Sequence, residues 1–216
     1  MSACIFLDID GTLLDHEIGI QNSSRAAIAQ AQANGHKVCL ATGRPKSEVD
    51  DEILSLPFDG CIYSCGAMVE SGGRLLFYQP FSQELVYEML HLLQACAIGF
   101  NLEGSHTSFL DPIGYDFFHS LFQRSMKDNS ELARQYMATI RMHPLHELKE
   151  TDTLQIMKIA TFITKESRLE EFDRLLPAQL KHIHHGFHEE CTNGEIYNHA
   201  ITKATGVDCL LSHFQI

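Results

Sequence analysis

The chain has 216 residues, 44% of them hydrophobic, and its 28 acidic and 16 basic side chains give it a formal net charge of −12. This length can bury the core of one large or two small domains, while the negative charge would be repelled by a nucleic-acid backbone, so no nucleic-acid partner is expected. Because there is neither a run of 18 apolar residues nor room for a signal peptide before the first predicted strand, we expect a cytoplasmic protein without a membrane span.

The first predicted strand runs from Cys4 to Leu7, an apolar segment typical of a strand buried on both faces. It delivers Asp8 and Asp10 to its carboxyl end, where Gly11 allows a sharp turn. Open α/β sheets bind ligands beyond the carboxyl ends of their strands. Two acids one residue apart could share a metal ion there, or divide the roles of nucleophile and proton donor. The alternative is a strand that ends in an acidic turn.

Helices and strands alternate over the following residues. The expected elements are a helix capped by Asn22 or Ser23 and ended by Gly35, a strand at 37–41, a helix opened by Pro45 with a solvated acidic face at 50–52, and a strand within 58–64. A hairpin at 69–78, turning at 71–73, completes this part. The order predicts an α/β fold with parallel strands joined by right-handed crossovers.

The pattern changes near Ser82 to an α+β block. We expect a helix capped by Ser82, strands at 99–102 and 107–110, a helix at 130–137, a strand at 153–164, a helix capped by Ser167 up to 176, and an extended segment at 180–189. Asp111 and Pro112 predict a turn, followed by core aromatic residues at 115, 117, 118 and 122. Short hinges are expected near Pro80 and near residues 191–194.

Histidine and cysteine offer no convincing metal site. Histidines stand at 182, 184, 185 and 188, and His182 and His184 would share one face of a strand. No carboxylate or cysteine completes a ligand set with them, so a polar strand face is favoured over a transition-metal site. The seven cysteines form no CxxC pair and no zinc spacing, and are expected to be reduced side chains of the core.

Three segments, in this order, resemble motifs of the haloacid dehalogenase-like hydrolases. Asp8-Ile9-Asp10-Gly11-Thr12 resembles the first motif of that superfamily, and Leu40-Ala41-Thr42-Gly43-Arg44-Pro45 resembles the second. The segment at 195–208, which contains Lys203, is similar to the lysine segment of the Cof-type phosphatases, which carry a type IIB cap. Alone, the second segment reads as a strand-to-helix turn and Lys203 as a solvated helix lysine. Their order after Asp8 and Asp10 carries the resemblance.

The resemblance implies a Rossmannoid core with a parallel sheet and an inserted α+β cap. Residues 1–81 would form the core with the first two motifs, residues 82–190 the cap, and residues 191–216 the return to the core with the lysine motif.

The resemblance also implies a chemistry. Asp8 would attack phosphorus to form an aspartyl-phosphate, and Asp10 would protonate the leaving oxygen and then activate water. Thr42 and Gly43 would bind the phosphoryl oxygens, and Lys203 would offset the negative charge. Mg²⁺ would be held by a side-chain oxygen of Asp8 and the backbone carbonyl of Asp10.

Two departures from the family pattern stand out. Cys65-Gly66 occupies the place of the usual Asn-Gly, which puts a polar contact from that position in doubt. Few residues follow Lys203, and no further strand with an acidic Gly-Asp…Asn-Asp motif is present. We therefore expect a core sheet that is incomplete at the C-terminus, a weakened Mg²⁺ site, and an exposed apolar edge at residues 4–7. Such an edge points to a fragment of a longer protein or to a homo-oligomer that covers it.

Three classes of function remain from the sequence. The first is a Mg²⁺-dependent phosphatase of small phosphorylated metabolites such as sugar phosphates, impaired in this truncated chain. The second is a non-catalytic relative that binds phosphorylated ligands, and the third is an interaction protein that pairs through its edge strand. A phosphomutase is a weaker enzymatic alternative, because no motif distinguishes it.

Overall fold

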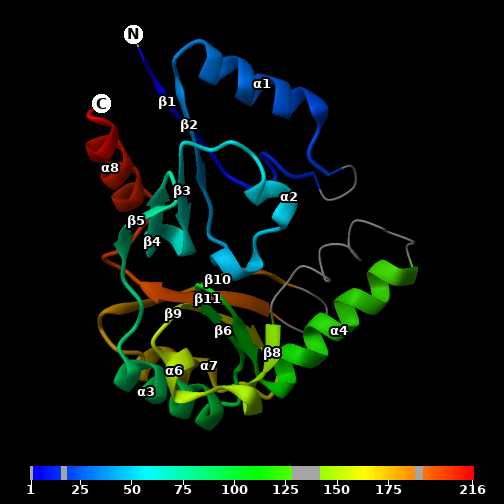
Figure 1. Cartoon of the computed structure of the whole chain (residues 1–216). Coiled ribbons are helices and arrows are strands. Elements are labelled where there is room, and N and C mark those ends of the chain that lie inside the picture. The colour runs from blue at the N-terminus through cyan, green and yellow to red at the C-terminus, as the bar shows by residue number, and fades with distance from the viewer. Residues whose placement is uncertain (1, 16–18, 128–141, 188–191) are drawn as a thin grey trace. The chain divides into compact units, whose positions relative to one another are not determined.

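A computed structural model of the chain describes residues 2–15, 19–127, 142–187 and 192–216, which fall into two compact units. The first unit contains the described residues of Met1–Gln79, Ser125–Ile140 and Ile201–Ile216, and the second contains those of Pro80–Arg124 and Arg141–Ala200. Each unit has a sheet of its own (Figure 1). Among the described residues, no helix combines the length and the apolar character that crossing a membrane requires.

The sheet of the first unit has the order β1-β2-β3-β4-β5. Its strands are β1 (Cys4–Leu7), β2 (Lys37–Ala41), β3 (Gly60–Tyr63), β4 (Met68–Ser71) and β5 (Arg74–Tyr78). The first three are parallel, as expected for crossover connections, and the last two are antiparallel. The hairpin between β4 and β5 turns at Gly72 and Gly73, whose φ angles of +56° and +75° suit a two-residue turn.

Helices α1 (Asn22–Ala33), α2 (Asp51–Leu54) and α8 (Lys203–Phe214) complete this unit. Helix α8 packs closely on the sheet because two glycines allow it. A Cβ on Gly206 would lie 2.7 Å from the Ile62 side chain, and a Cβ on Gly60 would lie 2.7 Å from that of Leu210. The core that forms there also contains Cys39, Ala41 and Val69. Helix α8 is therefore an integral part of the core.

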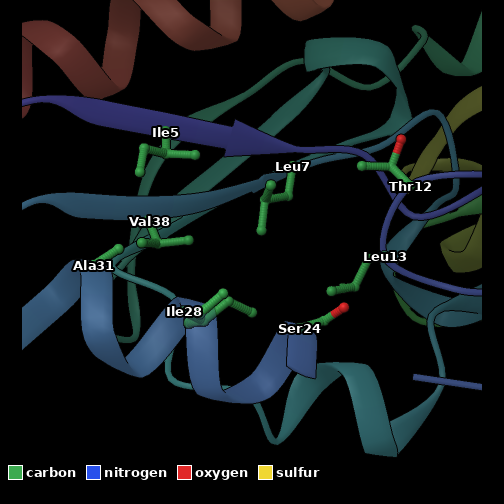
Figure 2. Close-up of a pocket in the computed structure, with 9 residues that line it drawn as sticks. Ile5, Leu7, Thr12, Leu13, Ser24, Ile28, Ala31 and Val38 are labelled. Carbon is green, nitrogen blue, oxygen red and sulfur yellow. The ribbon is translucent and has the colours of Figure 1, made fainter. Parts of the chain in front are cut away.

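Strand β1 is only partly buried, contrary to the expected burial on both faces. Within the described residues β1 pairs with β2 alone, so it is a terminal strand, and Ile5 is 36% exposed. The predicted apolar edge is thus observed. A pocket of about 220 Å³ lies between β1 and α1 (Figure 2), and its lining includes Ile5, Leu7, Leu13, Ile28 and Val38.

The segment after β2 differs from the expected helix. Pro45 precedes only one 3-10 turn, η1 (Lys46–Glu48), and the short helix α2 follows separately. The reason is that Val49 and Asp50 adopt extended ψ angles of 127° and 142°, which interrupt the helical path. Helix α1 also starts one residue early, with Gln21 as its N-cap, so neither Asn22 nor Ser23 caps it.

The sheet of the second unit has the order β10-β11-β9-β6-β7-β8. Its strands are β6 (Gly99–Gly104), β7 (Ser108–Leu110), β8 (Met142–Pro144), β9 (Ile156–Ile163), β10 (Leu180–Phe187) and β11 (Thr192–Asn198). Its helices are α3 (Gln83–Ala95), α4 (Pro112–Lys127), α6 (Glu150–Thr153) and α7 (Leu169–Leu175), with 3-10 turn η3 (Leu145–Glu147). Residues of α3 and α7 share one hydrophobic core with β6, β9, β10 and β11. Ser82 caps α3, as predicted, by accepting a hydrogen bond from the Leu85 N–H.

Two expectations for this unit are corrected, and a third is not tested. Asp111 and Pro112 begin α4 and do not form a simple turn, because the Asp111 carboxylate accepts hydrogen bonds from the N–H groups of Gly114 and Phe100. Ser167 does not cap α7: the N-cap is Arg168, and the Ser167 hydroxyl oxygen accepts instead from the Thr164 N–H while its proton is donated to the Ala97 carbonyl. The helix expected at 130–137 lies outside the described residues.

Residues 192–198, which we expect from the sequence in the segment returning to the core, form β11, which pairs with both β9 and β10 of the second unit. The first unit resumes at Ile201. Strand pairing places β11 in the second unit.

Candidate active site

Asp8 and Lys203 form an ion pair at the carboxyl end of β1. Lys203 Nζ donates to Asp8 Oδ2 at 2.7 Å, and the other carboxylate oxygen accepts from the Ile9 N–H at 2.9 Å. The two side chains are 42% and 38% exposed, respectively, so the pair remains accessible to a ligand from solvent. The structure thus brings together two residues that stand 195 positions apart in the sequence.

Lys203 is held in place by the way α8 begins. Thr202 is the N-cap, and it forms a capping box with Thr205 in which each side-chain oxygen accepts from the other residue's N–H. Gly66 packs directly on this cap: a Cβ on Gly66 would lie 2.2 Å from the Thr202 carbonyl oxygen. The loop after β3 therefore fixes the first turn of α8, and with it the base of the Lys203 side chain.

Asp10 is bound by Arg44, a residue of the second motif-like segment for which the sequence predicts no role. Arg44 Nε donates to Asp10 Oδ2 at 3.0 Å and Nη2 donates to Asp10 Oδ1 at 2.5 Å, which is a bidentate pair. Arg44 also lies 3.8 Å from Asp50 and donates to the Glu48 carbonyl. The Arg44 side chain is 11% exposed, so it is a fixed partner. The sequence signal for this contact is the position of Arg44 directly after Gly43, in the segment that resembles the second motif.

Thr42 and Gly43 follow β2, the parallel neighbour of β1. Leu7 lies opposite Leu40 in the register, so Asp8 and Thr42 stand at the ends of adjacent strands. Thr42 is fully buried, and its hydroxyl oxygen accepts from the Arg44 N–H at 3.1 Å. The Cys65 N–H donates to the Thr42 carbonyl at 3.2 Å, so the loops after β2 and β3 are joined.

Cys65 takes an unusual backbone conformation in this loop. Its φ angle is +55°, in the left-handed region where a Cβ is unfavourable. A Cβ on Gly43 would lie 3.4 Å from the Cys65 sulfur, which is an ordinary contact distance, so the two loops are neighbours at this point. The asparagine that Cys65 replaces in the resembling family tolerates this region better than cysteine does.

Burial argues against Cys39 and Cys61 as nucleophiles. None of the described cysteines is in a disulfide, and Cys39 and Cys61 lie inside the first unit's sheet. Burial raises the pKa of both the Cys39 and the Cys61 thiol, which keeps them protonated. Cys191 lies outside the described residues.

A second ion pair lies near the start of β2. Lys37 Nζ donates to Asp59 Oδ1 at 2.7 Å, and Gln32 and the Val38 N–H donate to Asp59 Oδ2. Burial opposes ionisation of Asp59, but these hydrogen bonds outweigh it and lower the pKa of the carboxyl. Because Lys37 and Asp8 lie at opposite ends of their strands, this pair contributes to stability and stands apart from the Asp8 site.

Comparison with known proteins gives one family. A sequence profile described as haloacid dehalogenase-like hydrolase matches residues 5–216. The chain is 32% identical over 89 residues to the protein YkrA and 30% identical over 95 residues to Phosphatase YwpJ, both of Bacillus subtilis. These alignments cover 41% and 42% of this chain but only 35% and 33% of the two relatives. The chain therefore spans about a third of the curated relatives it matches.

Solved structures show the same fold. The chain is similar to a haloacid dehalogenase subclass IIB sugar phosphatase, BT4131, with a TM-score of 0.72 and 22% identity over 100% of this chain and 77% of that one. It is also similar to a haloacid dehalogenase-like hydrolase from B. subtilis, with a TM-score of 0.74 and 20% identity over 99% of this chain and 79% of that one.

Proposed function

The chain belongs to the haloacid dehalogenase-like hydrolase family, and from this premise we propose that it acts as a phosphatase of small phosphorylated metabolites, sugar phosphates among them. The observation that carries the proposal is the contact between Asp8 and Lys203 at the carboxyl end of a parallel sheet. Ligands of such sheets bind at that end. A carboxylate paired with a cation there is suited to attack phosphorus, and the sugar phosphatase named above supports the substrate class.

In this proposal Asp8 is the nucleophile and forms an aspartyl-phosphate. The Ile9 N–H holds one carboxylate oxygen, which fixes the rotation of the Asp8 side chain. Lys203 offsets the negative charge that builds up when a phosphate dianion approaches the carboxylate. Thr42 and Gly43, at the end of the adjacent strand, would donate to the phosphoryl oxygens.

Asp10 is proposed as the general acid and then the general base, with Arg44 as its positioning residue. The bidentate guanidinium holds the plane of the Asp10 carboxylate. In the first half of the reaction Asp10 would give a proton to the leaving oxygen, and in the second half its carboxylate would take a proton from the water that hydrolyses the aspartyl-phosphate.

Magnesium fits the donor chemistry of this site. Mg²⁺ prefers oxygen ligands and is usually held by one or two carboxylates with water and phosphate, and Asp8 and Asp10 supply oxygen donors at one strand end. We propose that an Asp8 carboxylate oxygen and the Asp10 carbonyl hold it. When bound, the ion would neutralise charge on the phosphoryl oxygens.

The test is phosphate release from a panel of sugar phosphates with Mg²⁺, using the parent chain, Asp8→Asn and the matched control Asp51→Asn. Asp51 is an exposed carboxylate of α2 in the same unit. We expect Asp8→Asn to abolish turnover while thermal unfolding stays unchanged, and Asp51→Asn to retain the parent rate. An Asp8→Asn chain that matches the parent rate would overturn the proposal. Thermal stabilisation of the parent by a sugar phosphate, without turnover, would favour the non-catalytic ligand-binding alternative.

Strand β1 supports a second candidate function, self-association. It is a terminal strand within the described residues, and Ile5 and the apolar pocket beside it are accessible. We propose that this edge pairs with another copy of the chain. Sedimentation at increasing concentration should show association that Ile5→Lys removes and Leu75→Lys, on terminal strand β5, leaves intact. Equal sedimentation of all three chains would exclude the β1 edge.

A further inference from the structure

Three side chains of the second unit, Asp173 of α7 and His182 and His184 of β10, bring their ligand atoms within 4.8 Å of one another. His182 Nδ1 lies 2.8 Å from Asp173 Oδ1 and 3.3 Å from His184 Nε2. From the sequence, a polar strand face was favoured because no carboxylate completed the histidine pair. That expectation missed Asp173, which stands nine positions before His182 and reaches it only because α7 packs on β10.

The His182 ring is fixed on all sides. Its side chain is 2% exposed and packs edge-on against Phe172 at a centroid distance of 5.3 Å. Its Nε2 lies 3.0 Å from the Thr161 hydroxyl oxygen. Gly194 of the neighbouring strand leaves room for this contact, since a Cβ there would lie 2.8 Å from His182 Nε2 and 2.6 Å from the Thr161 oxygen. Nδ1 is therefore held toward Asp173 and His184.

The three side chains can offer lone pairs to one point. With the His182 proton on Nε2 and the His184 proton on Nδ1, an ion placed between the three atoms would meet one nitrogen of each imidazole and one carboxylate oxygen.

The spacing also fits a first-row transition ion. Bonds of about 2.0–2.1 Å in a tetrahedron place neighbouring ligand atoms about 3.3 Å apart. The two observed separations, 2.8 and 3.3 Å, are close to this value. Thr161 would then accept from the Nε2 proton and fix the tautomer that exposes Nδ1, as partners of metal-bound histidines generally do.

We propose that Asp173, His182 and His184 bind a divalent first-row transition ion, with Zn²⁺ as the best-suited probe. Two imidazoles and a carboxylate are ligands that Zn²⁺ accepts readily, and three protein ligands leave a position for water. Asp173 is 43% exposed and His184 is exposed, so an ion can enter from solvent. The site lies wholly within the second unit, and it is independent of the proposed phosphatase chemistry.

The test is calorimetric titration of the full chain with ZnCl₂ after treatment with a chelator. We expect one ion per chain, bound roughly 10- to 100-fold more weakly or not at all by His184→Gln and by Asp173→Asn. Thr161→Val, which removes only the partner of Nε2, should weaken binding roughly 10- to 100-fold. His146→Gln, at an exposed histidine of the same unit, is the matched control and should bind as the parent does.

Co²⁺ gives a second readout, because its visible absorption reports tetrahedral coordination by nitrogen and oxygen. Thermal unfolding without metal checks that each variant folds, which matters little for Asp173 and His184 because both are exposed. Equal Zn²⁺ affinity in the parent and His184→Gln would overturn the proposal, as would the absence of Zn²⁺ binding by the parent. Loss of binding in His188→Gln but not in His184→Gln would assign the ion to other residues and equally overturn it.

Discussion

Replacing Gly66 by alanine should destabilise the first unit more than the same replacement at any other turn glycine that the structure describes. Gly66 has a φ angle of +115°, and its added Cβ would lie 2.2 Å from the Thr202 carbonyl oxygen and 2.8 Å from its carbonyl carbon. The backbone strain costs about 1–3 kcal/mol and the overpacking about 1–3 kcal/mol more. A loss of about 2–6 kcal/mol is a large share of the roughly 5–15 kcal/mol that stabilises a typical domain.

Urea unfolding followed by circular dichroism measures this loss, and Gly72→Ala is the control that separates its two causes. Gly72 also has a positive φ, +56°, but a Cβ there would meet nothing within 4 Å. Gly72→Ala should therefore cost only the left-handed strain, about 1–2 kcal/mol. If Gly66→Ala lowers the free energy of unfolding no more than Gly72→Ala does, the close packing of Gly66 on the α8 cap does not exist in solution.

Three further predictions follow from other contacts. Lys203→Met should slow phosphate release by about 10²- to 10³-fold in initial-rate assays. It should change the free energy of unfolding by less than about 1 kcal/mol, because the pair with Asp8 is well exposed. A parent-like rate would show that Lys203 takes no part in the mechanism. Burial would raise the pKa of Asp59, but its hydrogen bonds outweigh burial and lower the pKa below the ordinary value of 3.8. The folded state therefore binds a proton at Asp59 less readily than the unfolded state does, and the ionised carboxylate stabilises the fold above pH 3.8. The stabilisation is lost as pH falls through the lowered pKa, and Asp59→Asn should flatten this acid limb in urea titrations; an unchanged limb would contradict the assignment. Cys65→Asn should raise the unfolding free energy by up to about 1 kcal/mol, since asparagine tolerates the +55° φ angle better, and lower stability would show that the Cys65 side chain contributes more than its backbone costs.

Local signals in the sequence predicted local structure well. The apolar run at β1, the Ser82 cap and the paired glycines of the hairpin each depend on neighbouring residues, and the structure confirms the strand (though not its burial), the cap and the turn. The start of α4 was missed although its signal was local: Asp111 as the cap with Pro112 in the first turn is a common helix start.

Contacts between distant segments could not be predicted in the same way. The Arg44 fork on Asp10 depends on how the loops after β1 and β2 fold toward each other, which no periodicity encodes. The approach of Asp173 to His182 depends on the packing of α7 against β10. The burial of β1 is a further example. Its apolar run predicts a strand buried on both faces, but its exposure is set by its terminal place in the sheet.

The late position of α8 in the chain has a consequence for synthesis on the ribosome. Asp8 and Lys203 are separated by 195 positions, so at about 5–20 residues per second roughly 10–40 s pass before the second partner is made. All of the second unit is synthesised in that interval. The apolar sheet face at Cys39, Ile62 and Val69 stays uncovered until Leu210 of α8 is synthesised and packs on it. During this interval the nascent chain would expose a hydrophobic surface that a ribosome-associated chaperone can bind.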